Sequence, residues 1–168
     1  MIREFDNIKP NIAPSVFVSE KAYIVGKVKI GDYSSVWPNV VIRGDNASIE
    51  IGSGVNIQDN SVIHADSDAF YGNYVTVGHG VICHAKRVDN FVLIGNGAII
   101  NDGVSIGEYS IIGAGAVVLE NVEIPPQSLV LGIPAQVKSP ILEKHEELIK
   151  STANSYISKS RKYLKLGL

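Results

Sequence analysis

The fold is decided by the stretch LIGNGAIINDGVSIGEYSIIGAGAVV, residues 93–118. Within it an aliphatic residue returns at every sixth position, and these residues are Ile94, Ile100, Ile106, Ile112 and Val118. A period of six fits neither an α-helix, with its 3.6 residues per turn, nor a simple alternating strand. It fits a short strand followed by a corner. Three such units would close a triangular coil of about 18 residues per turn.

The same period extends towards both ends of the chain. The further members are Ile12, Val18, Ile24, Ile30, Val36 and Ile42, then Ile51, Ile57 and Ile63, and finally Ile82, Val88, Ile124 and Val130. Residues one turn apart should stack in columns such as Ile82–Ile100–Val118 and Ile94–Ile112–Val130. A turn cannot bury its apolar side chains alone, so each depends on its neighbours. A β-sandwich with coincidental spacing is the alternative, and the length of the runs disfavours it.

The composition agrees with a strand-rich protein. The chain has 22 Ile and 20 Val against 9 Leu, and β-branched residues favour strands. With 168 residues, 45% of them hydrophobic and 19% charged, it is long enough for one domain with a core and is not disordered. The single cysteine, Cys83, excludes an intramolecular disulfide framework.

The charge pattern and the apolar runs limit the partners. The net charge of −2 excludes a generally basic nucleic-acid binder. It divides unevenly: residues 1–137 carry 8 basic against 14 acidic residues (−6), and residues 138–168 carry 7 against 3 (+4). No apolar run approaches the roughly 20 residues of a membrane span, and the amino-terminal MIREFDNIKP has no hydrophobic segment. We therefore expect a cytoplasmic protein without membrane or nucleic-acid partners.

The repeat ends near Val130 and gives way to a helix. The segment PPQSLVLGIPAQV, residues 125–137, is rich in residues that interrupt regular structure. Ser139 and Pro140 are predicted to be the N-cap and first residue of a helix of about 20–25 residues. We expect residues 1–137 to form the β-helix domain with an amino-terminal cap. Residues 138–168 should form a helix packed on the coil or on a neighbouring subunit, its basic surplus facing either the acidic coil or solvent.

Three breaks in the period carry the chemically interesting residues. They span Arg43–Ser48, His64 to Thr76, and Val77–Ile82. His64, His79 and His84 lie in or beside them, in the pattern His-x14-His-x4-His. Imidazole is a common zinc ligand, and three protein ligands leave a position open for water. Each histidine could instead be an ordinary structural side chain.

The coil geometry places these histidines on two faces. His64 and His84 are about one turn apart and should lie on one face, whereas His79 belongs to the preceding unit and should lie around a corner. A threefold assembly would bring His79 of one subunit against His64 and His84 of the next. We therefore predict three metal sites at the interfaces of a homotrimer.

The chain resembles the hexapeptide-repeat family, which has a left-handed parallel β-helix. The left hand is implied by this resemblance, since general crossover rules favour the right hand. More specifically, it resembles the γ-class carbonic anhydrases in VWPNVVIRGD (Val36–Asp45), NIQDNSVIH (Asn56–His64) and VTVGHGVICH (Val75–His84). The resemblance implies that His64, His79 and His84 bind zinc, with His79 from a neighbouring subunit. It also implies reversible hydration of carbon dioxide to bicarbonate.

The resemblance also implies roles for polar residues around the metal. Gln58 would hydrogen-bond the hydroxide or position carbon dioxide, and Asn56 would support it. Arg43, Asp45 and Asp59 match positions that hold the subunit interface by ion pairs, and Arg43 would also meet bicarbonate. Such pairs suit an interface because guanidinium and carboxylate bind in a two-pronged geometry. The alternative for each is an ordinary surface residue.

Other positions depart from the family pattern or admit two interpretations. Asn46 follows Asp45 where the archaeal prototype has a proton-moving glutamate, and Asp66 and Asp68 are only loosely comparable to its second acidic loop. Proton export, and so the rate of turnover, is left open. Tyr156 matches a tyrosine that related proteins bring near the metal, or else it simply packs. We expect Cys83 to be a small buried residue rather than a fourth ligand.

Two other functions are compatible with this sequence. The same coil serves coenzyme A-dependent acyltransferases and thioesterases, which work with one catalytic histidine. A catalytically weak metal-binding scaffold would keep the triad without turnover. Fold alone does not decide among them, and three imidazoles also accept Fe²⁺ or Co²⁺ in place of Zn²⁺.

Overall fold

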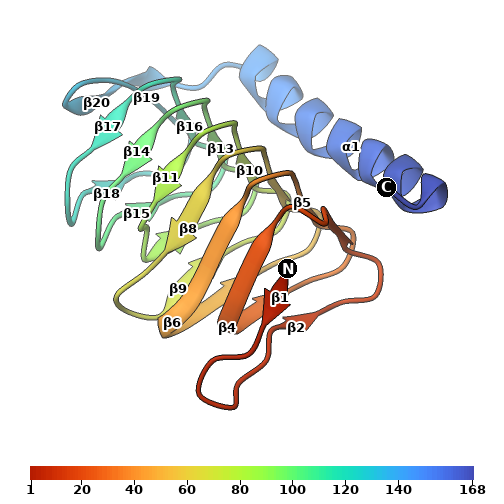
Figure 1. The fold of residues 1–168 in the computed structure, drawn as a ribbon. Helices are drawn as coiled ribbons and strands as arrows, with labels where there is room; N and C mark the ends of the chain where they lie inside the picture. Colours follow the sequence, from red (N-terminus) through yellow and green to blue (C-terminus); the bar gives the residue numbers. More distant parts are fainter.

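Most strands are only two or three residues long, because each carries one inward-pointing side chain between two corners. The computed structural model describes residues 1–168, and Figure 1 shows these strands stacked in about seven turns of a coil with one long helix beside it. Successive turns pair in parallel along three faces. The structure confirms the predicted parallel β-helix of hexapeptide repeats with a carboxy-terminal helix.

In each turn the chain runs along a first, a second and a third face in this order. The first face consists of β1 (Ile2–Arg3), the first part of β4 (Tyr23–Ile30) and of β6 (Val41–Ile51), β8 (Val62–His64), β11 (Ile82–Cys83), β14 (Ile99–Ile100) and β17 (Val117–Val118). The second face consists of β2 (Asn11–Ile12), the last parts of β4 and β6, β9 (Ala69–Tyr71), β12 (Arg87–Val88), β15 (Ser105–Ile106) and β18 (Glu123–Ile124). The third face consists of β3 (Phe17–Val18), β5 (Ser35–Val36), β7 (Asn56–Ile57), β10 (Thr76–Val77), β13 (Leu93–Ile94), β16 (Ile111–Ile112), β19 (Ser128–Gly132) and β20 (Ala135–Pro140).

The core runs along the axis of the coil. It contains 33 buried residues, and 15 of them are the Ile and Val of the six-residue period. Residues one turn apart stack in register, as in Ile94 on Ile112 and Ile112 on Val130. Full burial of such a side chain contributes roughly 1.5–3 kcal/mol relative to exposure. The coil is therefore stabilised one turn at a time by its neighbours.

One predicted column is wrong by one residue. Cys83, not Ile82, lies in the core between Ile63 and Ile100, and Ile82 points outward with 45% of its surface exposed. The inward position accepts the small thiol because the large ring of Tyr71, on the second face, fills the space beside it and donates a hydrogen bond to the Cys83 sulfur at 3.2 Å. The third break therefore lies between Cys83 and Val88, which are five positions apart, rather than between Val77 and Ile82.

The helix starts later than predicted. Ser139 and Pro140 belong to β20, which pairs antiparallel with β19 and extends the third face. Helix α1 (Glu143–Leu166) has Leu142 as its N-cap, and the Nδ1 atom of His145 accepts a hydrogen bond from the Leu142 backbone N–H at 3.0 Å. Its 24 residues fit the expected length. The helix does not combine the length and apolar character that a membrane span requires.

Helix α1 covers part of the third face. It contacts β3, β5, β7 and β10 and buries Ile149 and Ala153 (Figure 1). Several of its cations lie over aromatic rings rather than over carboxylates of the coil, with Lys150 above Tyr109 and Arg161 above Tyr33. The first face is left free of the helix.

Substitutions at two glycines with the same φ angle can test how closely α1 packs against the coil. Gly54 and Gly115 both have φ +67°, which strains any other residue by about 1–2 kcal/mol. A Cβ on Gly54 would lie 2.8 Å from the Tyr74 ring and 3.2 Å from Ile157 of α1, whereas one on Gly115 would meet nothing within 4 Å. We expect Gly54→Ala to cost about 1–3 kcal/mol more than Gly115→Ala, because only Gly54 is overpacked. Thermal denaturation of both variants measures the difference, and equal midpoints would contradict it.

Candidate metal centre

Two of the three predicted histidines meet on the first face. His64 ends β8 and His84 directly follows β11, and these two strands pair in register. Their rings lie 5.0 Å apart between centroids, at an angle of 71°. This confirms that the two histidines stand one turn apart on one face.

His64 faces an acidic partner with no hydrogen bond between them. Its Nε2 atom lies 3.2 Å from Oδ1 of Asp45, yet these are the two buried side-chain atoms of the protein that have no hydrogen-bond partner. Arg43 pairs with the other oxygen of Asp45, and so does not satisfy Oδ1. Buried polar atoms without a partner cost about 1–3 kcal/mol each. An imidazole nitrogen and a carboxylate oxygen left this way fit a site that takes a cation.

His84 is held by a residue that sequence analysis missed. Its Nδ1 atom lies 3.0 Å from Oδ1 of Asp102, which follows β14 on the next turn. Ligand atoms of Asp66, His84 and Asp102 all lie within 4.8 Å of one another. Asn46 donates to Oδ1 of Asp66 at 2.8 Å. The signal for Asp102 was present, since it stands 18 positions after His84, one regular turn of the coil.

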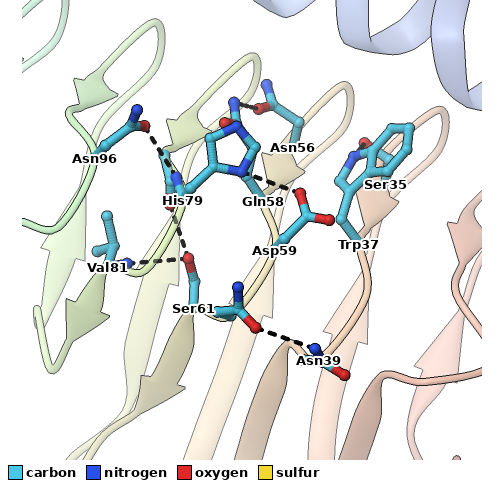
Figure 2. A network of polar contacts seen from close by, with 12 residues as sticks. Ser35, Trp37, Asn39, Asn56, Gln58, Asp59, Ser61, His79, Val81 and Asn96 are labelled. Atoms are coloured by element: carbon cyan, nitrogen blue, oxygen red, sulfur yellow. Dashed lines mark hydrogen bonds and ion pairs between the residues drawn. The ribbon is translucent and has the colours of Figure 1, made fainter.

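His79 lies around a corner from the other two. It is in the turn between β10 on the third face and β11 on the first. Its Nδ1 atom lies 3.0 Å from Oδ2 of Asp59, and its backbone N–H donates to Oδ1 of Asn96 at 3.0 Å. Figure 2 shows both contacts. The one set of three ligand atoms close enough to share an ion within this chain includes His84 but neither His64 nor His79. One chain therefore does not bring the three histidines together.

Asn56 and Gln58 form a buried amide network next to His79. Gln58 donates from Nε2 to Oδ1 of Asn56 at 2.9 Å (Figure 2). Asn56 in turn donates to the Thr76 hydroxyl at 2.8 Å. Both amides are at most 5% exposed, so Gln58 is not a surface amide. Its Oε1 atom is left for a further partner, because only Nε2 is used by Asn56.

Asp59 and Tyr156 also belong to this corner. Tyr156 of α1 packs edge-on against Trp37 at 5.4 Å between ring centroids. Partial burial raises the pKa of the Tyr156 phenol, and the negative charge of Asp59 raises it further. Tyr156 therefore lies on the His79 side of the molecule rather than beside the His64–His84 pair. Arg43, Asp45 and Asp59 each have a partner within the chain, and their place at a subunit interface stays a prediction.

The coil of six-residue units makes this chain a hexapeptide-repeat protein, and the histidines at two of its corners are candidate metal ligands. A model of the bacterial transferase hexapeptide (six repeats) matches residues 87–120. A probable carbonic anhydrase of Methanocaldococcus jannaschii is 47% identical over 89% of this chain and 95% of its own. A carbonic anhydrase of Geobacillus kaustophilus is 42% identical over 97% and 91%. The chain belongs to the γ-class carbonic anhydrase family.

A solved structure with nearly the same fold bears the name of a different activity. The crystal structure of a putative acetyltransferase from Bacillus cereus is 38% identical, has a TM-score of 0.93, and covers 98% of this chain and 97% of its own. The fold is thus shared over nearly the whole length. That protein is named for acetyl transfer, a different reaction from the one that names the relatives above.

The buried thiol yields a prediction that separates a core residue from a ligand. Burial raises the pKa of Cys83, so less of it is the reactive thiolate at pH 8 than in a free thiol. We expect Cys83 of the native protein to react very slowly with a chromogenic disulfide reagent, and to react at once after unfolding in guanidinium chloride. Because it is the only cysteine, there is no background. Rapid labelling of the native protein would mean that the thiol is accessible and not part of the core.

Proposed function

We propose that this protein catalyses the reversible hydration of carbon dioxide to bicarbonate, at metal sites between the subunits of a homotrimer. His64 and His84 of one subunit and His79 of the next would be the ligands. The native metal would be Zn²⁺, with Fe²⁺ or Co²⁺ as substitutes, and the location cytoplasmic. The observation that carries the proposal is the buried Nε2 atom of His64, which faces Asp45 without a hydrogen bond beside the ring of His84.

The first face supports a shared site because both of its edges carry ligands. His79 stands at the corner where the chain enters this face, and His64 and His84 stand where it leaves. Between them the outward side chain of Ile82 is 45% exposed and in register with Val62 and Ile99. Helix α1 contacts the third face and leaves this surface open. A threefold arrangement that joins first faces edge to edge completes three histidines per site.

The residues around the site have separate tasks. A bound Zn²⁺ supplies hydroxide near neutral pH by acidifying water. Asn56 fixes the amide of Gln58, whose Oε1 atom then positions the nucleophile or carbon dioxide. Asp45, paired with Arg43, holds a negative charge against His64, which favours a cation there. Asp66, anchored by Asn46 and exposed beside His84, is the carboxylate placed to take the released proton to solvent.

Stopped-flow hydration of carbon dioxide by protein of measured metal content tests the activity. We expect His79→Ala to lower kcat/KM by about 100-fold or more, since losing a ligand exceeds the roughly 10- to 100-fold cost of removing a ligand's hydrogen-bond partner. His145→Ala is the matched control, because this fourth histidine caps α1. Full metal loading without hydration at any buffer concentration would favour a scaffold. Acyl transfer from coenzyme A thioesters by the metal-free protein would favour the acyltransferase alternative.

Mixed trimers test whether the site is shared. His79→Ala chains keep His64 and His84, and His64→Ala chains keep His79, so neither homotrimer has a complete site. Random mixing of equal amounts should restore about one quarter of the sites, and hence of the activity, because a complete site needs one chain of each kind in the right order. Activity that stays at the level of the separate variants would mean that each site is built within one chain.

A further inference from the structure

His84 is held in place from the turn of the coil that follows it. Its Nδ1 atom lies 3.0 Å from Oδ1 of Asp102. The segment around Asp102 is itself fixed by two hydrogen bonds to the next turn. The Asp102 backbone carbonyl accepts from the Asn121 N–H at 2.8 Å, and the side-chain amide of Asn101 donates to the Val118 carbonyl at 2.8 Å. The Asp102 carboxylate that contacts the His84 ring therefore comes from a hydrogen-bonded segment of the following turn.

A carboxylate at Nδ1 decides which ring nitrogen is free. A carboxylate accepts hydrogen bonds, so a neutral imidazole in contact with it carries its proton on Nδ1 and keeps a lone pair on Nε2. His79 has the same arrangement, with its Nδ1 atom 3.0 Å from Asp59. The two pairs are opposite in direction, because Asp59 comes from the turn before its histidine and Asp102 from the turn after.

We propose that Asp102 is a positioning residue for metal binding: it fixes the Nδ1–H form and the orientation of His84, so that Nε2 is presented to the metal. This inference rests on the proposed function and adds to it a residue outside the three histidines. Hydrogen-bond partners of metal-bound histidines raise the basicity of the ligand, and their removal costs roughly 10- to 100-fold in metal affinity.

Asp102 is suited to substitution because it supports the ligand more than it supports the fold. Its side chain is 51% exposed, and exposed ion pairs contribute only about 0–1 kcal/mol to folding. Glu120 provides a matched control. It occupies the same place one turn further on, after β17, is exposed, and makes no hydrogen bond or ion pair with a side chain.

The test measures metal affinity and ring protonation in the full-length protein. Zn²⁺ affinity is obtained by competition with a chromogenic chelator for the unaltered protein, Asp102→Ala, Asp102→Asn and Glu120→Gln. We expect Asp102→Ala to bind about 10- to 100-fold more weakly. The Zn²⁺ affinity of Asp102→Asn, which keeps an acceptor oxygen but no charge, should lie between those of Asp102→Ala and the unaltered protein. The affinity of Glu120→Gln should equal that of the unaltered protein. The thermal midpoint of the metal-free protein should be the same in all four.

Ring-nitrogen NMR of the metal-free protein gives a readout that does not depend on the metal. We expect His84 to carry its proton on Nδ1 in the unaltered protein and to become a mixture of both forms in Asp102→Ala. Unchanged affinity and an unchanged ring form in Asp102→Ala would overturn the inference.

Two further outcomes separate this inference from the proposed function. If the unaltered protein binds no metal, the proposed function fails, and this is seen before any variant is compared. If His79→Ala keeps its metal with full affinity, Asp102 is itself a ligand together with Asp66 and His84, and the positioning role is overturned.

Discussion

The structure depends on the stacking of each inward side chain on the one a turn away. Parallel backbone pairing fixes the register, and a β-branched side chain fills the triangular interior once per face. Little room is left for a turn of different length, because an extra residue would shift every later side chain out of the core. Additional residues must therefore leave the coil at a corner.

All departures from the period fall at one corner, where the chain passes from the first face to the second. Ile42 and Ile51 are nine positions apart there, Ile63 and Tyr71 eight, and Cys83 and Val88 five. Arg43, His64 and His84 lie at this corner. The regular corners keep the coil in register, and the irregular one carries polar residues that a packed turn would exclude. Two of the three candidate histidines thus lie at the irregular corner, whereas His79 lies at a regular one.

Residues on adjacent turns of the coil contact and orient the candidate site residues. Asp102 reaches His84 from the following turn, and Asp59 reaches His79 from the preceding one. The buried amide of Asn56, which holds Gln58, donates to Thr76 across the same pair of turns as Asp59 and His79. Gln58 and Arg43 are held by residues only two positions away. His84, His79 and Asn56, in contrast, each contact a residue 18–20 positions away. Stacking, which stabilises the fold, also supplies these partners.

The sequence by itself determined the β-helix and the histidines one turn apart, because a six-residue period fixes which side chains stack. It also determined that a helix follows, because the apolar residues after the repeat recur at helical spacing. It misplaced Ile82, since the six-residue series was counted back from Val88, whereas that corner is one residue short and Cys83 takes the inward position beside Tyr71. It placed the helix start at Ser139, since only tertiary pairing with β19 shows that this segment is a strand. The Asp102–His84 contact and the His64 nitrogen without a hydrogen bond were likewise decided by the tertiary structure, because hydrogen bonds between turns depend on side-chain direction and not on spacing alone.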